Sequence, residues 1–121
     1  MKNPVGYFEI PVNDLDRAIR FYEGVFGDKI ERSALDGLEM GLFPSSHQAQ
    51  GITGALVKGD SYVPTTEGSR LYFSSVNIDE TLTKVLSFGG SILYPKTSIG
   101  KLGWVAEFKD VEGNCIALHC E

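Results

Sequence analysis

Hydrophobic and polar residues follow two spacings along this chain, and the spacings occur in the same order twice. Residues 5–12 alternate between apolar and polar side chains, which is typical of a strand with one buried face. Residues 15–26 then carry apolar side chains every three to four positions, which predicts an amphipathic helix. The second half opens in the same way, with a strand predicted at residues 71–76 and a helix at residues 78–88.

Short apolar strands are predicted after each helix. They cover residues 29–35, 38–43 and 52–57 in the first half, and residues 91–94, 104–108 and 114–119 in the second. Asp36-Gly37 is a strong signal for a tight hairpin turn, and Glu112-Gly113 indicates another turn. Each half is therefore predicted to be a β-α-β-β-β unit.

Polar residues and glycines mark the ends of the two predicted helices. Asn13 and Asn77 are expected to be N-caps, and Glu80 stands where a capping box requires a carboxylate. Gly27 and Gly89 are expected to end the helices, because glycine readily adopts the left-handed conformation found there.

The two halves repeat at a nearly constant distance along the sequence. Gly27 and Gly89 are 62 residues apart, and so are Ala55 and Ala117. A unit of about 60 residues is marginal as an independent domain, so two of them are expected to share one core. We predict one domain over residues 1–121, made of half-repeats 1–60 and 68–121, with a ligand site in the cleft between them.

Composition excludes several classes of function. The 121 residues carry a formal net charge of −5 and no run of Lys or Arg, so nucleic acid is not an expected partner. The chain has no long apolar stretch and no signal peptide, which argues against a membrane partner and predicts a cytoplasmic protein. Cys115 and Cys120 fall on opposite faces of one predicted strand, so we do not expect a disulfide between them.

Two motifs resemble one known family over the whole chain. Pro11-Val12-Asn13-Asp14-Leu15 leads to Phe21-Tyr22 and Phe26-Gly27, and Phe108-Lys109-Asp110-Val111-Glu112-Gly113-Asn114 leads to Ile116-Ala117-Leu118. The sequence is similar to the vicinal oxygen chelate superfamily, which includes glyoxalase I, extradiol dioxygenases, fosfomycin-resistance enzymes and bleomycin-binding proteins. The resemblance implies an α+β fold in which two β-α-β-β-β modules form curled mixed sheets around a cavity. It also implies a homodimer, in which modules are sometimes exchanged between chains, and a small-molecule ligand.

The resemblance further implies four metal-ligand positions, two in each half. They fall on Tyr7, Ala55, Leu71 and Ala117. These residues offer too few nitrogen and oxygen donors for a divalent cation, so we predict no metal at the usual site. A cation is expected only at a relocated site that uses Glu9, His119 and a further carboxylate.

Strand alternation places Glu9, Val57, Phe73 and His119 on the same face as these positions. We hypothesise that Glu9, His119 and Tyr7 carry any acid–base chemistry. The residues expected to line the ligand site are Val57, Leu71, Phe73, Trp104 and Ala117.

Several alternatives stay open at this point. Glu9 is equally explained as a carboxylate held by neighbouring donors, His119 as an edge-strand residue in solvent, and Tyr7 as a packing residue. Alternation does not decide whether Glu39 and Glu107 face the cavity, and His47 is expected to be solvated in a polar loop. The function is then either a lyase- or isomerase-type enzyme acting on a small polar compound, or a metal-free protein that sequesters a small planar or hydrophobic molecule.

Overall fold

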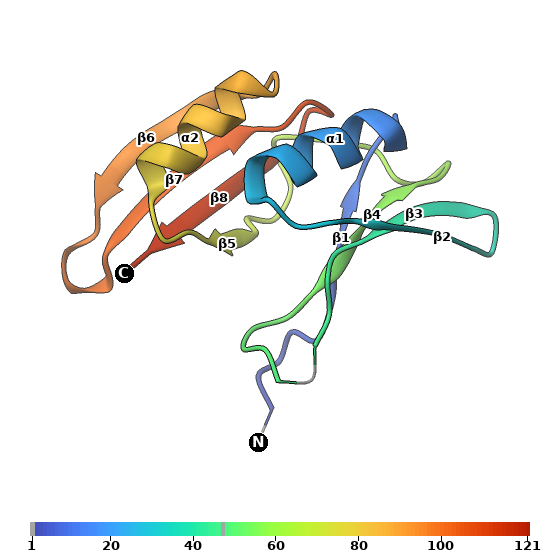
Figure 1. The fold of residues 1–121 in the computed structure, drawn as a ribbon, viewed down its shortest axis with the longest axis horizontal. Helices are drawn as coiled ribbons and strands as arrows, with labels where there is room; N and C mark the ends of the chain where they lie inside the picture. The colour runs from blue at the N-terminus through green and yellow to red at the C-terminus, as the bar shows by residue number, and fades with distance from the viewer. Residues whose placement is uncertain (1, 47) are drawn as a thin grey trace.

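The computed structural model describes residues 2–46 and 48–121 and contains two β-α-β-β-β modules (Figure 1). The first module contains β1 (Phe8–Pro11), α1 (Leu15–Phe26), β2 (Glu31–Leu35), β3 (Leu38–Leu42) and β4 (Gly54–Lys58). The second contains β5 (Tyr72–Ser74), α2 (Ile78–Ser87), β6 (Ser91–Ser98), a 3-10 turn η1 (Gly100–Leu102), β7 (Trp104–Lys109) and β8 (Cys115–Cys120). The predicted α+β class and the order of elements are confirmed.

Each module contributes a mixed sheet of four strands with the same topology. The order is β1-β4-β3-β2 in the first sheet and β5-β8-β7-β6 in the second. In both sheets the first strand of the module runs parallel to its last strand, and the other pairs are antiparallel. Within the described residues no helix is long and apolar enough to cross a membrane.

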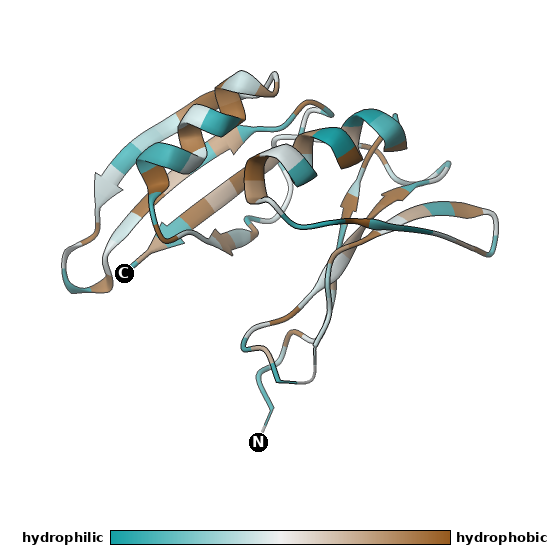
Figure 2. Ribbon diagram, viewed as in Figure 1, coloured by the Kyte–Doolittle hydropathy of each residue, from teal (hydrophilic) through white to brown (hydrophobic). Residues whose placement is uncertain are grey.

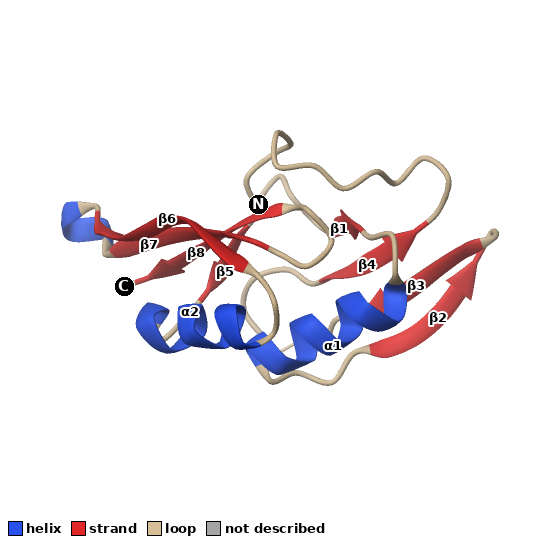
Figure 3. Cartoon of the chain, turned by 90° about the horizontal axis from the view of Figure 1, so that it is seen from above, coloured by secondary structure: helices blue, strands red, loops and turns tan. Residues whose placement is uncertain are grey.

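Both helices lie on the same side of the two sheets (Figure 3). We call this side of each sheet the helix face and the opposite side the open face. Hydrophobic residues recur along one side of each helix and in the central strands (Figure 2), and they form one core that draws residues from both modules. The open faces are therefore the surfaces that the helices leave uncovered.

Each module has one helix end as predicted and one that differs by a single residue. The C-cap of α2 is Phe88, one residue before the predicted Gly89, which has a φ of 99°. Asn77 caps α2 as predicted, accepting a hydrogen bond from the backbone N–H of Glu80 at 3.1 Å. The cap of α1 is Asp14 rather than Asn13, because the Asp14 side chain accepts from the N–H of Arg17 at 3.0 Å. Gly27 ends α1 in the left-handed conformation, with φ at 79°.

This difference changes which residues of the two modules correspond. The N–H of Val12 donates to Val57 O, and the N–H of Ser75 donates to His119 O. Val57 and His119 are 62 residues apart, whereas Val12 and Ser75 are 63 apart. In the structure Val12 therefore corresponds to Ser75. The sequence alignment, which paired Val12 with Val76, is wrong by one residue for the first strand of the second module.

Two further predictions can be compared with the structure. Asp36 and Gly37 form the β2–β3 turn with positive φ angles of 53° and 78°, as the Asp-Gly signal predicts. The strand predicted at residues 91–94 is longer and runs to Ser98 through two irregularities in register. Pro95 is tolerated because β6 is an edge strand.

His47, predicted to be solvated, lies outside the described residues.

A buried polar network joins the two modules. The turn before β8 holds Asp110, whose Oδ1 accepts from the N–H groups of Glu112, Gly113 and Asn114 at 2.9 Å each. Glu112 Oε1 accepts from the first N–H groups in front of α1, those of Asn13 and Asp14, at 2.8 Å.

The same network includes an ion pair and two further contacts. Arg17 Nε lies 2.6 Å from Glu112 Oε2, and the Glu112 side chain is completely buried. Asn114 donates to Pro11 O at 2.8 Å, while its own Oδ1 accepts from the N–H of Thr65 in the connector at 3.2 Å. The second module therefore fixes both the start of α1 and the path of the connector.

Candidate functional site

The open face of the first sheet carries a carboxylate held by two phenols. Tyr7 donates to Glu9 Oε2 at 3.0 Å, and Tyr62 donates to Glu9 Oε1 at 2.7 Å. Tyr7 and Glu9 share this face because strand residues alternate, as the sequence predicted. Tyr62 comes from the connector, which the sequence indicated only as a linker.

The surroundings of this cluster are apolar. Ala55 pairs directly with Glu9 across β1 and β4, and it packs with Met40, Val57 and Tyr62. Partial burial raises the pKa of Tyr7 to about 12, with the hydrogen bond and the charge of Glu9 adding to the effect. The pKa of the Tyr62 phenol is raised chiefly by its hydrogen bond to Glu9.

The open face of the second sheet carries a different set of side chains at corresponding places. Tyr72 pairs with Ala117, and Ala117 pairs with Glu107. Arg70 Nε lies 3.2 Å from Glu107 Oε2, and the Cys115 thiol lies 3.6 Å from Glu107 Oε1. Burial raises the pKa of the Cys115 thiol, and the negative charge of Glu107 adds to this, so the thiol is not an activated nucleophile.

His119 is not brought together with Glu9 in the described structure. Its Nε2 lies 2.6 Å from Leu102 O, and the residue lines a shallow hollow at the end of β8 with Ser74 and Val76. The partners of Glu9 are Tyr7 and Tyr62 instead. The predicted trio of Glu9, His119 and Tyr7 is therefore assembled only in its Tyr7–Glu9 part.

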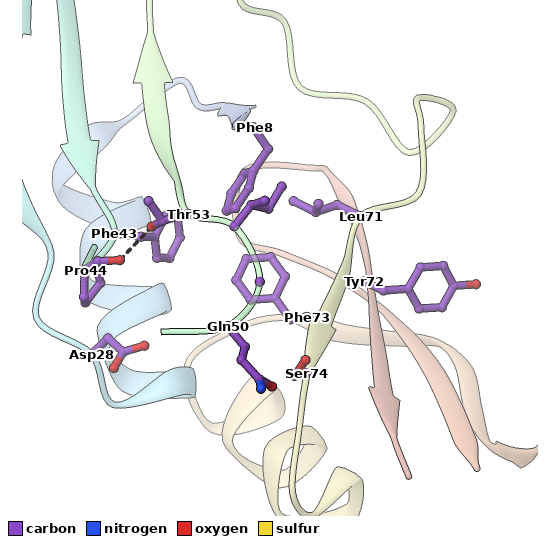
Figure 4. A pocket seen from close by; sticks show the side chains of 12 residues that line it. Phe8, Asp28, Phe43, Pro44, Gln50, Thr53, Leu71, Tyr72, Phe73 and Ser74 are labelled. Atoms are coloured by element: carbon purple, nitrogen blue, oxygen red, sulfur yellow. Dashed lines mark hydrogen bonds between the residues drawn. The ribbon is translucent and has the colours of Figure 1, made fainter. Parts of the chain in front are cut away.

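A pocket of about 400 Å³ lies where the two modules meet (Figure 4). Its apolar lining includes Phe8 from β1, Phe43 after β3, and Leu71 and Phe73 at β5, with Pro44 and Ile52 from the loop before β4. The centroids of the three phenylalanine rings are 5.7, 5.8 and 5.8 Å apart, so the rings form one aromatic cluster. Both modules thus contribute to a single aromatic surface.

The rim of the pocket is polar and is formed largely by the loop before β4. Asp28, Gln50, Thr53 and Ser74 line it, and the Thr53 hydroxyl donates to Pro44 O at 2.7 Å. Figure 4 shows the ring of Tyr72 directed away from the cluster, although its backbone borders the pocket.

The turns before β4 and β8 occupy equivalent positions in the two modules. Gly51 and Gly113 are 62 residues apart and both have positive φ, at 84° and 104°. The first turn lines the pocket, whereas the second carries the network around Glu112. Equivalent segments therefore serve different purposes in the two halves.

Residues 5–118 match the sequence profile of the glyoxalase/bleomycin resistance protein/dioxygenase superfamily. The chain belongs to this superfamily. The match covers both modules, in agreement with the motifs that the sequence shares with the vicinal oxygen chelate proteins. No functionally curated protein matches the chain significantly.

Solved structures of the superfamily have the same fold at low sequence identity. A glyoxylase/bleomycin resistance protein/dioxygenase domain from Frankia sp. EAN1pec is 18% identical, with a TM-score of 0.75 and coverage of 99% of this chain and 98% of that one. Glyoxalase I of Leishmania major, described as trypanothione-dependent, is 18% identical with a TM-score of 0.73, covering 99% and 88%. A fosfomycin resistance protein from Listeria monocytogenes is 18% identical with a TM-score of 0.69, covering 100% and 93%. At this identity the likeness establishes the fold alone.

The superfamily's metal positions are occupied here by residues that do not fit a divalent cation. Because Ser75 corresponds to Val12, the position equivalent to Tyr7 is Arg70 rather than Leu71. These positions hold the Tyr7 phenol, whose pKa is raised, and the Arg70 guanidinium, which is paired with Glu107. The other two hold the methyl groups of Ala55 and Ala117. Together they do not form a ligand set for a metal ion. Within residues 2–46 and 48–121, no three His, Cys, Asp or Glu side chains converge as a metal site would require.

The same one-residue offset relocates other predicted site residues. Leu71 and Phe73 face the helices and the intermodule pocket, and Tyr72 takes the open-face position expected for Phe73. Trp104 also faces the helices, where Lys96 Nζ lies 4.8 Å from the centre of its ring.

The two carboxylates left open by the sequence lie on opposite faces. Glu107 is on the open face of its sheet, whereas Glu39 is near the start of α1 and pairs with Lys58 at 3.4 Å. Val57 and Ala117 are on the open faces, where both are fully buried. The residues that the sequence did not indicate include Tyr62 and Arg70, which no local pattern in the connector distinguishes, and Phe8, Phe43 and Asp28 at the pocket.

Proposed function

We propose that this member of the superfamily binds a small planar or hydrophobic molecule in the intermodule pocket without using the family's metal. The observation that carries the proposal is the cluster of Phe8, Phe43 and Phe73, in which both modules present aromatic rings to one pocket. Planar ligands are favoured because offset and edge-to-face packing can extend such a cluster by one more ring.

The dimensions and the lining of the pocket support binding of a small organic molecule. Its volume of about 400 Å³ lies in the range of sites for small organic ligands. Apolar side chains form its interior, and the polar groups of Gln50, Thr53 and Asp28 stand at its rim. This arrangement provides affinity by apolar burial and orientation by a few hydrogen bonds.

Binding is favoured over acid–base catalysis by the predicted trio. General acid–base groups must lie within hydrogen-bonding reach of the same substrate atoms. Glu9 is held by two phenols on the first sheet, and His119 is held by Leu102 O on the second. A relocated metal site at Glu9 and His119 is disfavoured for the same reason.

The test uses N-phenylnaphthylamine, a neutral dye that fluoresces in apolar sites, and two tryptophan variants of β5. Leu71→Trp places bulk in the pocket, so we expect dye affinity to fall at least tenfold. Tyr72→Trp is the matched control, because the Tyr72 ring points away from the pocket (Figure 4), and its dye affinity should stay within twofold of wild type. Equal affinity in both variants and the wild type would refute binding at this pocket.

A further inference from the structure

Among the residues that the structure describes, none gives the Glu9 carboxylate a cationic partner. Glu107, on the open face of the second sheet, is paired with Arg70 at 3.2 Å. Within the described part of the chain, no Lys, Arg or His lies within 4.0 Å of the Glu9 carboxylate, whose hydrogen-bond partners are two neutral phenols. The negative charge on this face is therefore held in place but not neutralised.

The phenols fix the direction of the carboxylate and leave it able to accept more bonds. Tyr7 and Tyr62 each donate to a different oxygen, and a carboxylate has about four acceptor directions in total. The raised pKa of about 12 for Tyr7 keeps its phenol neutral at physiological pH. The cluster of Tyr7, Glu9 and Tyr62 thus carries one negative charge.

Apolar groups border the cluster on the sheet itself. Ala55 stands beside Glu9 in the register and is fully buried. Met40 and Val57 continue this buried surface, and the Tyr7 ring is half-exposed above it. A ligand at Glu9 would therefore contact the carboxylate and the exposed parts of the Tyr7 and Tyr62 rings.

We propose that Tyr7, Glu9 and Tyr62 form a binding site for an organic cation, either a protonated amine or a quaternary ammonium group. Aromatic rings beside a carboxylate attract such cations through charge and through the electron-rich ring faces. A divalent metal ion is disfavoured, because the described structure supplies a single carboxylate here and no His or Cys. The site is distinct from the intermodule pocket, which lies on the helix side of β5.

The probe is choline, compared with its neutral isostere dimethylbutanol, in calorimetric or NMR titrations at low salt. We expect choline to bind weakly and saturably, since the site is open to water, and the isostere to bind at least tenfold more weakly. Glu9→Gln should reduce choline affinity at least tenfold. Glu39→Gln is the control, because Glu39 is an exposed carboxylate of the same sheet near the helix face, and it should change affinity less than twofold.

A second variant guards against loss of fold in Glu9→Gln. Tyr62→Phe keeps the charge and removes one hydrogen bond that orients it, so we expect affinity to fall twofold to fivefold while the thermal unfolding midpoint stays near that of Glu39→Gln. Leu71→Trp should leave choline affinity unchanged, which separates this site from the pocket. The proposal is overturned if wild-type protein does not bind choline, if the isostere binds equally, or if Glu39→Gln weakens binding as much as Glu9→Gln.

Discussion

Tyr22 and Asp110 lie in different modules, and the Tyr22 phenol donates a hydrogen bond of 2.6 Å to Asp110 Oδ2. Tyr22 is on α1, whereas Asp110 precedes β8, and both are buried. Burial raises the pKa of Tyr22 well above its usual value, and the negative charge of Asp110 raises it further. The phenol therefore remains a donor at physiological pH, and the bond joins the modules where water is excluded.

Removing this hydroxyl should destabilise the fold. We expect Tyr22→Phe to lower the free energy of unfolding by about 1–3 kcal/mol, because a buried charged acceptor loses a donor. Asn114 Nδ2 still donates to the same oxygen at 3.1 Å, which keeps the effect in this range. Tyr94→Phe is the control, since Tyr94 is exposed, and urea denaturation of both variants gives the comparison.

Breaking the ion pair at the start of α1 should have a larger effect. Glu112→Gln leaves Arg17 without its partner and weakens acceptance from the two N–H groups in front of the helix, so we expect a loss of about 3 kcal/mol. The exposed pair of Glu80 and Lys84 is the control, and Glu80→Gln should cost less than about 0.5 kcal/mol. Equal effects in denaturant melts would contradict the importance of the buried network.

Stability should decline between the ordinary pKa of a tyrosine phenol, 10, and the raised pKa of Tyr7, about 12. Tyr7 has a pKa of about 12 in the folded protein against an ordinary value of 10, so its contribution is complete below pH 10 and is lost as the pH rises to 12. In Glu9→Gln, burial still raises the pKa of Tyr7, but the hydrogen bond and charge of Glu9 no longer do. We expect tyrosinate absorbance to appear at lower pH in this variant, and Tyr7→Phe identifies the phenol concerned. Identical alkaline titrations of Glu9→Gln and wild type would be inconsistent with the contact.

Metal content can be measured directly. Because Tyr7, Ala55, Arg70 and Ala117 do not form a ligand set, we expect purified and dialysed protein to retain less than about one-tenth of an equivalent of Zn, Ni, Fe or Mn. Inductively coupled plasma mass spectrometry gives the content, and added Zn should not shift the thermal unfolding midpoint. A stoichiometric metal would contradict the prediction.

The chain is also predicted to form a homodimer. In the described structure the edge strands β1, β2, β5 and β6 each pair with a neighbour on one side only, and large apolar residues such as Val76, Leu102 and Tyr72 are exposed. Light scattering at micromolar concentration should therefore give about twice the chain mass of 13.2 kDa. A monomeric mass would show that these surfaces stay uncovered.

Periodicity in the sequence was sufficient for the fold but not for the register between the halves. The helical and strand spacings predicted both α-helices and all eight strands, since both depend on local patterns that burial reinforces, but they missed η1 and the end of β6. The first strands were misaligned by one residue, because both Asn13 and Asp14 are chemically suitable caps and only the bond to Arg17 N–H distinguishes them. That single residue transferred Leu71 and Phe73 from the expected open face to the helix face.

The candidate sites were predicted only where they depend on alternation within one strand. Tyr7 and Glu9 were placed together correctly, because they are two residues apart on β1. Tyr62 contacts Glu9 across 53 residues, and Asp28 reaches the pocket from the end of α1. Contacts of this kind depend on the path of loops, for which the sequence carries no periodic signal.

The turn at Gly51 lines the pocket, whereas the turn at Gly113 holds the Glu112 network. This difference decides where substitutions can change the ligand site. Mutations in residues 50–53 alter the pocket lining without touching the contacts of Glu112 that fix α1. Mutations in residues 110–114 would instead disturb the junction of the modules. Substitutions that change ligand preference can therefore be made in the first turn without disturbing the contacts that fix α1.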